Sequence, residues 1–243
     1  MTDPKAALTL QKFAVEELKW ETESIFTLVL VPDEGEVFEF LPGQWAYLHL
    51  LNEDGTTWRA PFSIATAPEE SKNKVEFSIK IRGDFTKRAS RLIPGDRVAV
   101  QGPFGVFFLH EDVSPLVMFA AGIGIMPFRS MIRSLALRKA GTEVYLFYSG
   151  KSVEGMAYFP ELKKIALEWT AFHPVFTLTE SAPPKWEGEI GRINAEMVKK
   201  YYHAFDQGEF LMCGPEHFME DVESMLKAQS VDTKKRLRRE LFG

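Results

Sequence analysis

The chain has 243 residues, of which 45% are hydrophobic and 26% charged, a composition typical of a soluble protein of one or two domains. Its single cysteine, Cys213, excludes a disulfide framework, a four-cysteine zinc ribbon and an iron–sulfur cluster held by four thiolates. The net charge of −5 argues against a nucleic-acid partner, and the five scattered histidines predict no metal site. Because the chain starts without a signal-peptide pattern and has no uncharged stretch long enough to span a membrane, we expect a cytoplasmic protein.

The first half of the chain, up to about residue 112, predicts short strands separated by turns. Glycine-containing pairs such as Pro42-Gly43 and Pro94-Gly95 mark the turns, and one short helix is expected near Thr86–Leu92. The expected strands are Ser24–Val31, Trp45–Leu51, Phe62–Ala65, Lys74–Ile81 and Arg97–Gln101. Runs of this length and spacing indicate an antiparallel barrel or sandwich.

The hydrophobic period changes after Ser114, where strands begin to alternate with helices. The expected strands are Leu116–Ala121, Glu143–Tyr148, Ala171–Thr179 and Glu209–Cys213. The expected helices follow Phe128, cover Phe159–Leu167 and Asn194–Tyr201, and start again at Pro215. This alternation indicates a parallel sheet covered on both faces. We therefore expect two domains, residues 1–112 and 113–243.

Two loops of the second half are candidates for binding a nucleotide. The sequence Phe119–Pro127 (FAAGIGIMP) places Gly122 and Gly124 between a strand and a helix, where backbone amides and the helix dipole favour phosphate. A second strand ends in Cys213–Met219 (CGPEHFM), also at the carboxyl edge where ligands bind parallel sheets. Each loop alone also fits an ordinary capping turn. Together they favour a mononucleotide or dinucleotide site.

The first half carries a motif suited to a flat ring and its phosphates. Trp58–Ala65 (WRAPFSIA) contains a cation at Arg59, an aromatic ring at Phe62 and a hydroxyl at Ser63. Downstream, Gly83–Thr86 (GDFT) puts a glycine and a hydroxyl at a helix start. Gly102–Gly105 (GPFG) then closes this half of the chain.

In order and spacing, these five blocks resemble the ferredoxin–NADP⁺ reductase superfamily over nearly the whole chain. The resemblance implies an N-terminal antiparallel six-stranded flavin-binding barrel followed by a Rossmann-like parallel-sheet domain that binds NAD(P)H. It also implies an enzyme that transfers a hydride from the nicotinamide to FAD and passes the electrons onward.

The resemblance also implies roles for individual residues. Ser63 would hydrogen-bond near flavin N5, Cys213 would receive the nicotinamide, and Phe242 would cover the other flavin face. The implied flavin-binding residues are Arg59, Pro61, Phe62, Ser63, Lys80, Ile81, Gly83, Thr86 and Phe242. The implied nucleotide-binding residues are Gly122, Ile123, Gly124, Lys151, Gly214, Pro215 and Met219.

Several positions depart from the family pattern. Arg59 stands four residues before Ser63, whereas the family has its arginine three residues before the hydroxyl. Thr179-Glu180 occupies the place where relatives often bind a 2′-phosphate, and a carboxylate there is unfavourable for phosphate. Lys151 still offers one positive charge. The sequence therefore favours NADH over NADPH as the donor.

The electron acceptor is left open by the sequence. Expected partners are a small carrier such as ferredoxin or flavodoxin, or an oxygenase component. The basic run Lys234–Arg239 would dock an acidic carrier or would be a solvated helix face. Two alternatives remain: a reductase that uses free flavin or ferric chelates as substrate, and a non-catalytic flavin-binding subunit of a larger electron-transfer complex.

Overall fold

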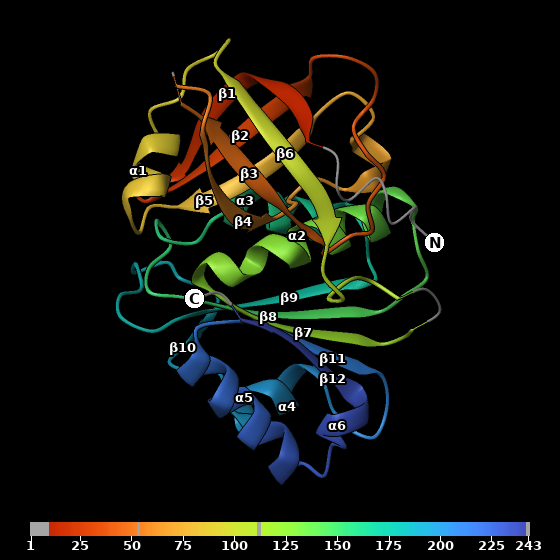
Figure 1. The fold of residues 1–243 in the computed structure, drawn as a ribbon. Helices are drawn as coiled ribbons and strands as arrows, with labels where there is room; N and C mark the ends of the chain where they lie inside the picture. The colour runs from red at the N-terminus through yellow and green to blue at the C-terminus, as the bar shows by residue number, and fades with distance from the viewer. Residues whose placement is uncertain (1–9, 53, 111–112, 242–243) are drawn as a thin grey trace. The chain divides into compact units, whose positions relative to one another are not determined.

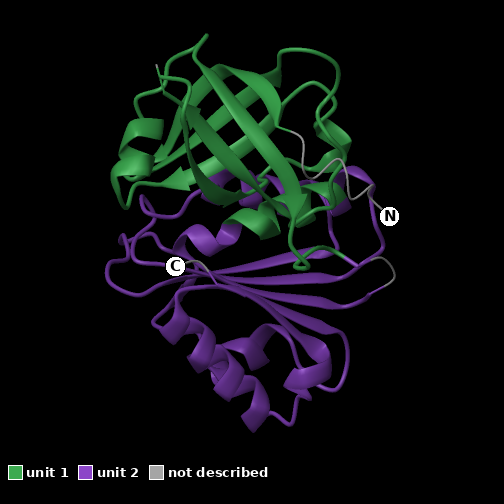
Figure 2. Ribbon diagram, viewed as in Figure 1, with its two compact units in different colours: residues 1–109, 126–134 green, residues 110–125, 135–243 purple. Residues whose placement is uncertain are grey.

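The computed structural model describes residues 10–52, 54–110 and 113–241. The chain divides into two compact units (Figure 2). The barrel unit comprises residues 1–109 and 126–134, and the parallel-sheet unit comprises residues 110–125 and 135–243.

The barrel unit is built on a six-stranded antiparallel sheet with the strand order β4-β3-β6-β1-β2-β5 (Figure 1). Its strands are β1 (Gln11–Thr22), β2 (Ile25–Pro32), β3 (Trp45–Leu51), β4 (Thr57–Ser63), β5 (Val75–Lys80) and β6 (Arg97–Phe104). Ile64, which directly follows β4, forms an isolated antiparallel β-bridge with Phe77 of β5. This bridge connects the first and last strands of the order and closes the sheet. The predicted antiparallel six-stranded barrel is confirmed.

Alternate residues of these strands point inward and fill the barrel. The fully buried members of this core include Phe13, Phe26, Leu28, Leu48, Phe77 and Val98. The helix α1 (Asp84–Ala89) contributes Phe85 and Ala89 to the same core. The helix begins two residues before its predicted start, because Thr86 caps it from the third helical position.

The parallel-sheet unit has a six-stranded sheet with the order β10-β9-β8-β7-β11-β12 (Figure 1). Its strands are β7 (Leu116–Ala121), β8 (Val144–Gly150), β9 (Phe172–Leu178), β10 (Glu189–Ile190), β11 (Glu209–Gly214) and β12 (Leu237–Leu241). All five neighbouring pairs run parallel, which confirms the predicted Rossmann-like arrangement. Its helices include α3 (Phe159–Glu168), α4 (Ala195–Tyr201), α5 (Glu216–Ala228) and α6 (Thr233–Arg236).

Helix α2 (Ile125–Leu137) follows β7 and the short turn η3 (Gly122–Gly124). The sequence assigned this helix wholly to the second half of the chain. In the structure, residues 126–134 belong to the barrel unit instead. Within that unit the ring of Phe128 packs edge-on against Phe107, and Met131 lies against Gly43.

Candidate active site

The predicted flavin-binding motif lies on strand β4, and its side chains alternate between the two faces of that strand. Ala60 and Phe62 pack against the barrel core, and Phe62 also lies against Phe85 of α1, with ring centroids 5.8 Å apart. Strand alternation directs Arg59 and Ser63 the other way. Ser63 is buried, with 2% of its surface exposed, and pairs with Trp45 of β3.

The Arg59 side chain contacts two residues of neighbouring strands, Tyr47 of β3 and Gln101 of β6. Its guanidinium lies 4.5 Å from the centre of the Tyr47 ring and donates a hydrogen bond of 3.3 Å to Gln101. It also contributes, after burial, to lowering the pKa of His49. In the structure the Arg59 guanidinium is therefore held by Tyr47 and Gln101. Its assignment to the flavin diphosphate stays a prediction.

The segment from Lys80 to Thr86 leads from β5 into α1. The Thr86 hydroxyl accepts hydrogen bonds from the amides of Arg82 and Gly83 and donates one to the Gly83 carbonyl, at 2.8–3.0 Å. Gly83 has an open side, because an added Cβ there would meet no atom within 4 Å. Phe85 of the same helix contacts Phe62. The structure thus brings the predicted ring-binding and phosphate-binding segments of the barrel unit together.

The turn η3 requires glycine at two positions for two different reasons. Gly122 has φ +54°, in the left-handed region that favours glycine, and its open side meets no atom within 4 Å. Gly124 instead approaches β11 so closely that a Cβ would lie 2.1 Å from the Cys213 carbonyl oxygen. The Tyr148 hydroxyl donates to the Gly122 carbonyl at 3.2 Å. Burial raises the pKa of Tyr148, which keeps this hydroxyl protonated as a donor.

The end of β11 lies beside this turn. Cys213 and Gly214 are buried, and a Cβ on Gly214 would lie 3.1 Å from the Cβ of Ala121. Pro215 is the N-cap of α5, and Met219 follows it in the apolar core of this unit. The predicted residues of β7, η3 and β11 are therefore brought together at the carboxyl edge of the sheet.

Strand β12 adds a carboxylate, that of Glu240, which lies outside the five sequence blocks and had no predicted role. Glu240 pairs with Cys213 in the parallel register of β12 and β11. Burial, and secondarily the charge of Glu240, raises the pKa of the Cys213 thiol, so the thiol is neutral at physiological pH. Only the strand pairing reveals this neighbour, since Glu240 lies 27 residues further along the chain. Phe242 lies outside the described residues.

Lys151 and Glu180 form an ion pair where β8 and β9 end. Their charged atoms are 2.6 Å apart, and both side chains are largely exposed. The backbone supports the pair, because the amides of Glu180 and Ser181 both donate to the Lys151 carbonyl. An exposed pair of this kind contributes little stability. The pair nevertheless places the Glu180 carboxylate next to Lys151, the basic residue predicted to bind the nucleotide at this edge of the sheet.

The loop Trp186–Gly191 has a clear packing role. The Trp186 indole donates to the Glu189 carbonyl at 2.9 Å and its ring lies against Phe159. A Cβ on Gly188 would lie 2.5 Å from the Trp186 ring. These contacts hold β10 beside β9.

The basic run near the carboxyl terminus is mostly occupied by internal partners. Arg236 donates to the carbonyls of Phe205, Gln207 and Gly208, and Arg238 and Arg239 pair with Glu209 and Glu223. The run therefore forms the short helix α6 and the strand β12, rather than one solvated helix face.

Two kinds of feature are absent from residues 10–52, 54–110 and 113–241. None of the helices in this part of the chain is long and apolar enough to cross a membrane. Within the same ranges, no three side chains of His, Cys, Asp or Glu gather where they could hold a metal ion.

Comparison with known proteins gives a family match to each half of the chain. Residues 13–109 match the oxidoreductase FAD-binding domain, and residues 118–224 match the oxidoreductase NAD-binding domain. Among solved structures, the fold is similar to the flavohem-like FAD/NAD-binding domain of nitric oxide dioxygenase from Vibrio cholerae. The TM-score is 0.86 at 24% identity, covering 96% of this chain and 98% of that one.

Two curated relatives are similar over most of this chain. The reductase component of propane 2-monooxygenase from Mycolicibacterium goodii is 30% identical over 87% of this chain and 62% of its own length. One subunit of the Na⁺-translocating NADH-quinone reductase from Marinomonas sp. is 30% identical over 77% of this chain and 49% of its own length. The chain thus spans about half to three-fifths of these relatives.

Proposed function

Because the chain belongs to the ferredoxin reductase-type family of FAD- and NAD-binding oxidoreductases, we propose that it transfers a hydride from NADH to FAD and delivers the electrons to a separate acceptor protein. The observation that carries this proposal is the ordered match of both domain families along one chain, over residues 13–109 and 118–224. These matches confirm the family and the two cofactor types predicted from the sequence.

The barrel unit offers residues that fit FAD. Phe62 presents a half-buried ring next to α1, and Gly83 leaves space beside the amides that Thr86 orders. Bound FAD supplies a ring that accepts a hydride and releases electrons. In our proposal Phe62 stacks on that ring, Ser63 donates a hydrogen bond to it, and the Gly83–Thr86 segment binds phosphate.

The parallel-sheet unit offers residues that fit a nicotinamide nucleotide. Gly122 leaves the η3 turn open on one side, so that its backbone can approach a phosphate. In our proposal this turn binds the nucleotide, and the neutral Cys213 thiol and the Glu240 carboxylate orient the nicotinamide.

An anaerobic absorbance scan of the purified protein tests the proposed function. We expect flavin bands that bleach when NADH is added. Bands that persist with both NADH and NADPH would contradict the proposed role of the parallel-sheet unit. Protein that takes up no FAD would favour a non-catalytic subunit, and flavin lost on gel filtration would favour a reductase of free flavin.

For the acceptor, we propose an oxygenase component or a small electron-carrier protein. The support is the similarity to a reductase component of propane 2-monooxygenase. A reductase of this kind should pass electrons singly to a one-electron acceptor after reduction by NADH. Reduction of purified ferredoxin, flavodoxin and an oxygenase component, each measured under the same anaerobic conditions, would separate the candidates.

We predict that Glu180 selects NADH over NADPH. Its carboxylate repels a 2′-phosphate and also neutralises Lys151 at 2.6 Å. Glu180→Gln should therefore lower the ratio of kcat/KM for NADH to that for NADPH by about tenfold, which corresponds to about 1.4 kcal/mol. Glu168→Gln is a matched control, since it removes an exposed carboxylate paired with Lys164 on α3. An unchanged ratio in Glu180→Gln would overturn this role.

We predict that Cys213 acts on hydride transfer more than on nucleotide affinity. Its buried neutral thiol lies at the end of β11, beside η3 and Glu240. Cys213→Ala should slow flavin reduction by NADH by about tenfold, with a much smaller change in the Kd for NAD⁺. Rapid-mixing absorbance and NAD⁺ titration measure the two quantities. If only the melting temperature changes, the thiol serves as part of the core.

A further inference from the structure

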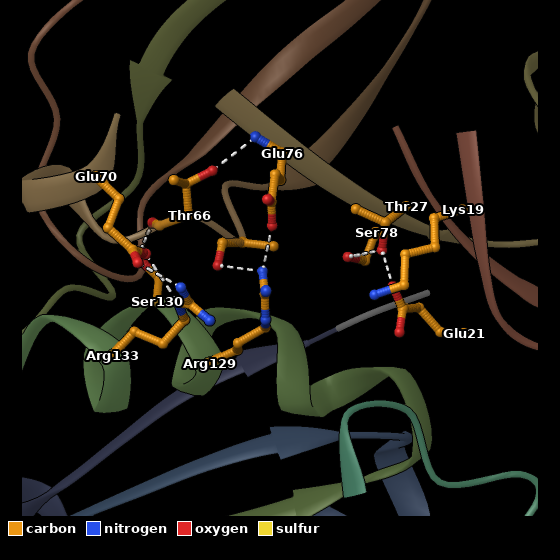
Figure 3. A network of polar contacts seen from close by, with 11 residues as sticks. Lys19, Glu21, Thr27, Thr66, Glu70, Glu76, Ser78, Arg129, Ser130 and Arg133 are labelled. Atoms are coloured by element: carbon orange, nitrogen blue, oxygen red, sulfur yellow. Dashed lines mark hydrogen bonds and ion pairs between the residues drawn. The ribbon is translucent and has the colours of Figure 1, made fainter. Parts of the chain in front are cut away.

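Helix α2 has a polar face that is hydrogen-bonded to the segment following β4 (Figure 3). The Arg129 guanidinium donates from one nitrogen, Nη1, to the Ala65 carbonyl at 3.0 Å and to the Glu76 carboxylate at 2.6 Å. The Ser130 hydroxyl donates to the Thr66 carbonyl at 2.6 Å. The helix therefore bonds two successive carbonyl groups of this segment.

These contacts are largely buried, and the two bonded carbonyl groups belong to fully buried residues. The Arg129 side chain is 6% exposed and the Glu76 side chain 17%. Ala65, Thr66 and Ser130 are between 0% and 2% exposed. A buried carbonyl that loses its donor in such a place has no water to replace it, so each bond strongly restricts the local backbone.

The segment 64–66 is also bonded to the barrel strands. The Ile64 amide donates to the Gln44 carbonyl, and the Ala65 amide donates to the Glu76 carbonyl. The Thr66 hydroxyl accepts from the Glu76 amide at 2.6 Å. Glu76 thus contacts the segment through its backbone, while its carboxylate holds Arg129 against the same segment.

We propose that Arg129 is a positioning residue of the flavin site. Ser63 is the last residue of β4 and directly precedes this segment. The orientation of its side chain therefore depends on how firmly the backbone of residues 64–66 is fixed. By fixing the Ala65 carbonyl and Glu76, Arg129 sets the path of residues 64–66 and with it the orientation of Ser63. The inference rests on the proposed function, because it takes Ser63 to be a flavin contact.

The same helix offers a matched control. Arg133 donates from Nε to Glu70 at 2.8 Å, and the pair is half-buried at 26% exposure of each side chain. It joins α2 to the turn η2 (Pro68–Glu70), five residues beyond Ala65. Removing this pair loosens the docking of the helix without removing a donor from residues 64–66.

The test is a titration of apoprotein with FAD, followed by quenching of flavin fluorescence, together with the visible spectrum of the bound flavin. Arg129→Met should raise the Kd for FAD by about tenfold and shift the flavin bands. Arg129→Lys, which keeps a cation, should recover most of the affinity. Arg133→Met should lower the melting temperature of the apoprotein and leave the Kd and the flavin bands unchanged.

A double variant separates positioning from charge balance. Arg129→Met with Glu76→Met leaves no unpaired buried charge and should recover stability even if Arg129→Met alone does not fold. Its FAD affinity should stay reduced, because the Ala65 carbonyl still lacks its donor. Wild-type FAD affinity and spectrum in this variant would overturn the inference, as would equal effects of Arg129→Met and Arg133→Met. Wild-type protein that binds no FAD would instead overturn the proposed function.

Discussion

The substitution Gly124→Ala is expected to disrupt the nucleotide site of the parallel-sheet unit. The added methyl group would lie 2.1 Å from the carbonyl oxygen of Cys213 and 2.5 Å from its carbonyl carbon. Both are backbone atoms of β11, so the turn η3 or the strand must shift. We expect a loss of about 1–3 kcal/mol in the free energy of unfolding and a rise in KM for NADH of about tenfold or more.

Thermal unfolding and steady-state kinetics measure these two effects. Gly141→Ala is the matched control, because a Cβ there meets no atom within 4 Å and its backbone is not in the left-handed region. Gly122→Ala separates a second cause: its Cβ meets no protein atom, so its effect on stability comes from the strain of φ +54° alone, while its effect on KM also includes the methyl group on the side proposed for phosphate. If Gly124→Ala behaves like Gly141→Ala, the close approach to Cys213 does not matter for nucleotide binding.

Ser63→Ala is expected to slow flavin reduction while FAD stays bound. The Ser63 hydroxyl is buried at the end of β4, where we propose that it hydrogen-bonds the flavin. Loss of a hydrogen bond to the reacting ring should cost about 1–3 kcal/mol, or about tenfold to a hundredfold in rate. Anaerobic rapid mixing with NADH, followed by flavin absorbance, gives the rate.

Ser71→Ala controls for the loss of a buried hydroxyl in the same unit. Ser71 is 6% exposed and donates to the Pro68 carbonyl at 3.2 Å. We expect this variant to lose stability and to keep the wild-type rate of flavin reduction. A wild-type reduction rate in Ser63→Ala would refute the proposed role of Ser63.

The organisation into two halves could be predicted from local patterns. Short alternating runs in the first half and continuous apolar strands between amphipathic helices in the second half require different sheets to bury their apolar faces. The strands β3 and β7 begin and end at the predicted residues. Strand and helix patterns are visible because each depends on residues close together in the chain.

Strand β1 could not be predicted in this way. Between Val15 and Thr22 it contains four charged residues, and its alternation is interrupted by irregularities in the pairing with β2. It is a strand because β2 and β6 satisfy its backbone on both sides. Strand β12 is a similar case: its basic residues suggest a solvated helix, yet pairing with β11 and the partners of Arg238 and Arg239 make it a strand.

The sequence by itself determined the motifs of the candidate site, because a glycine turn, a strand end and a helix start are local features. The tertiary structure alone decided which side chains face them. In the folded chain Glu240 pairs with Cys213, and the Tyr148 hydroxyl donates a hydrogen bond to the Gly122 carbonyl. Arg59 lies over the Tyr47 ring, and Arg129 donates a hydrogen bond to the Ala65 carbonyl. These contacts join residues 12 to 64 positions apart, or depend on which way a strand faces. Such contacts depend on which distant strands and helices become neighbours, and local patterns in a single chain do not specify that.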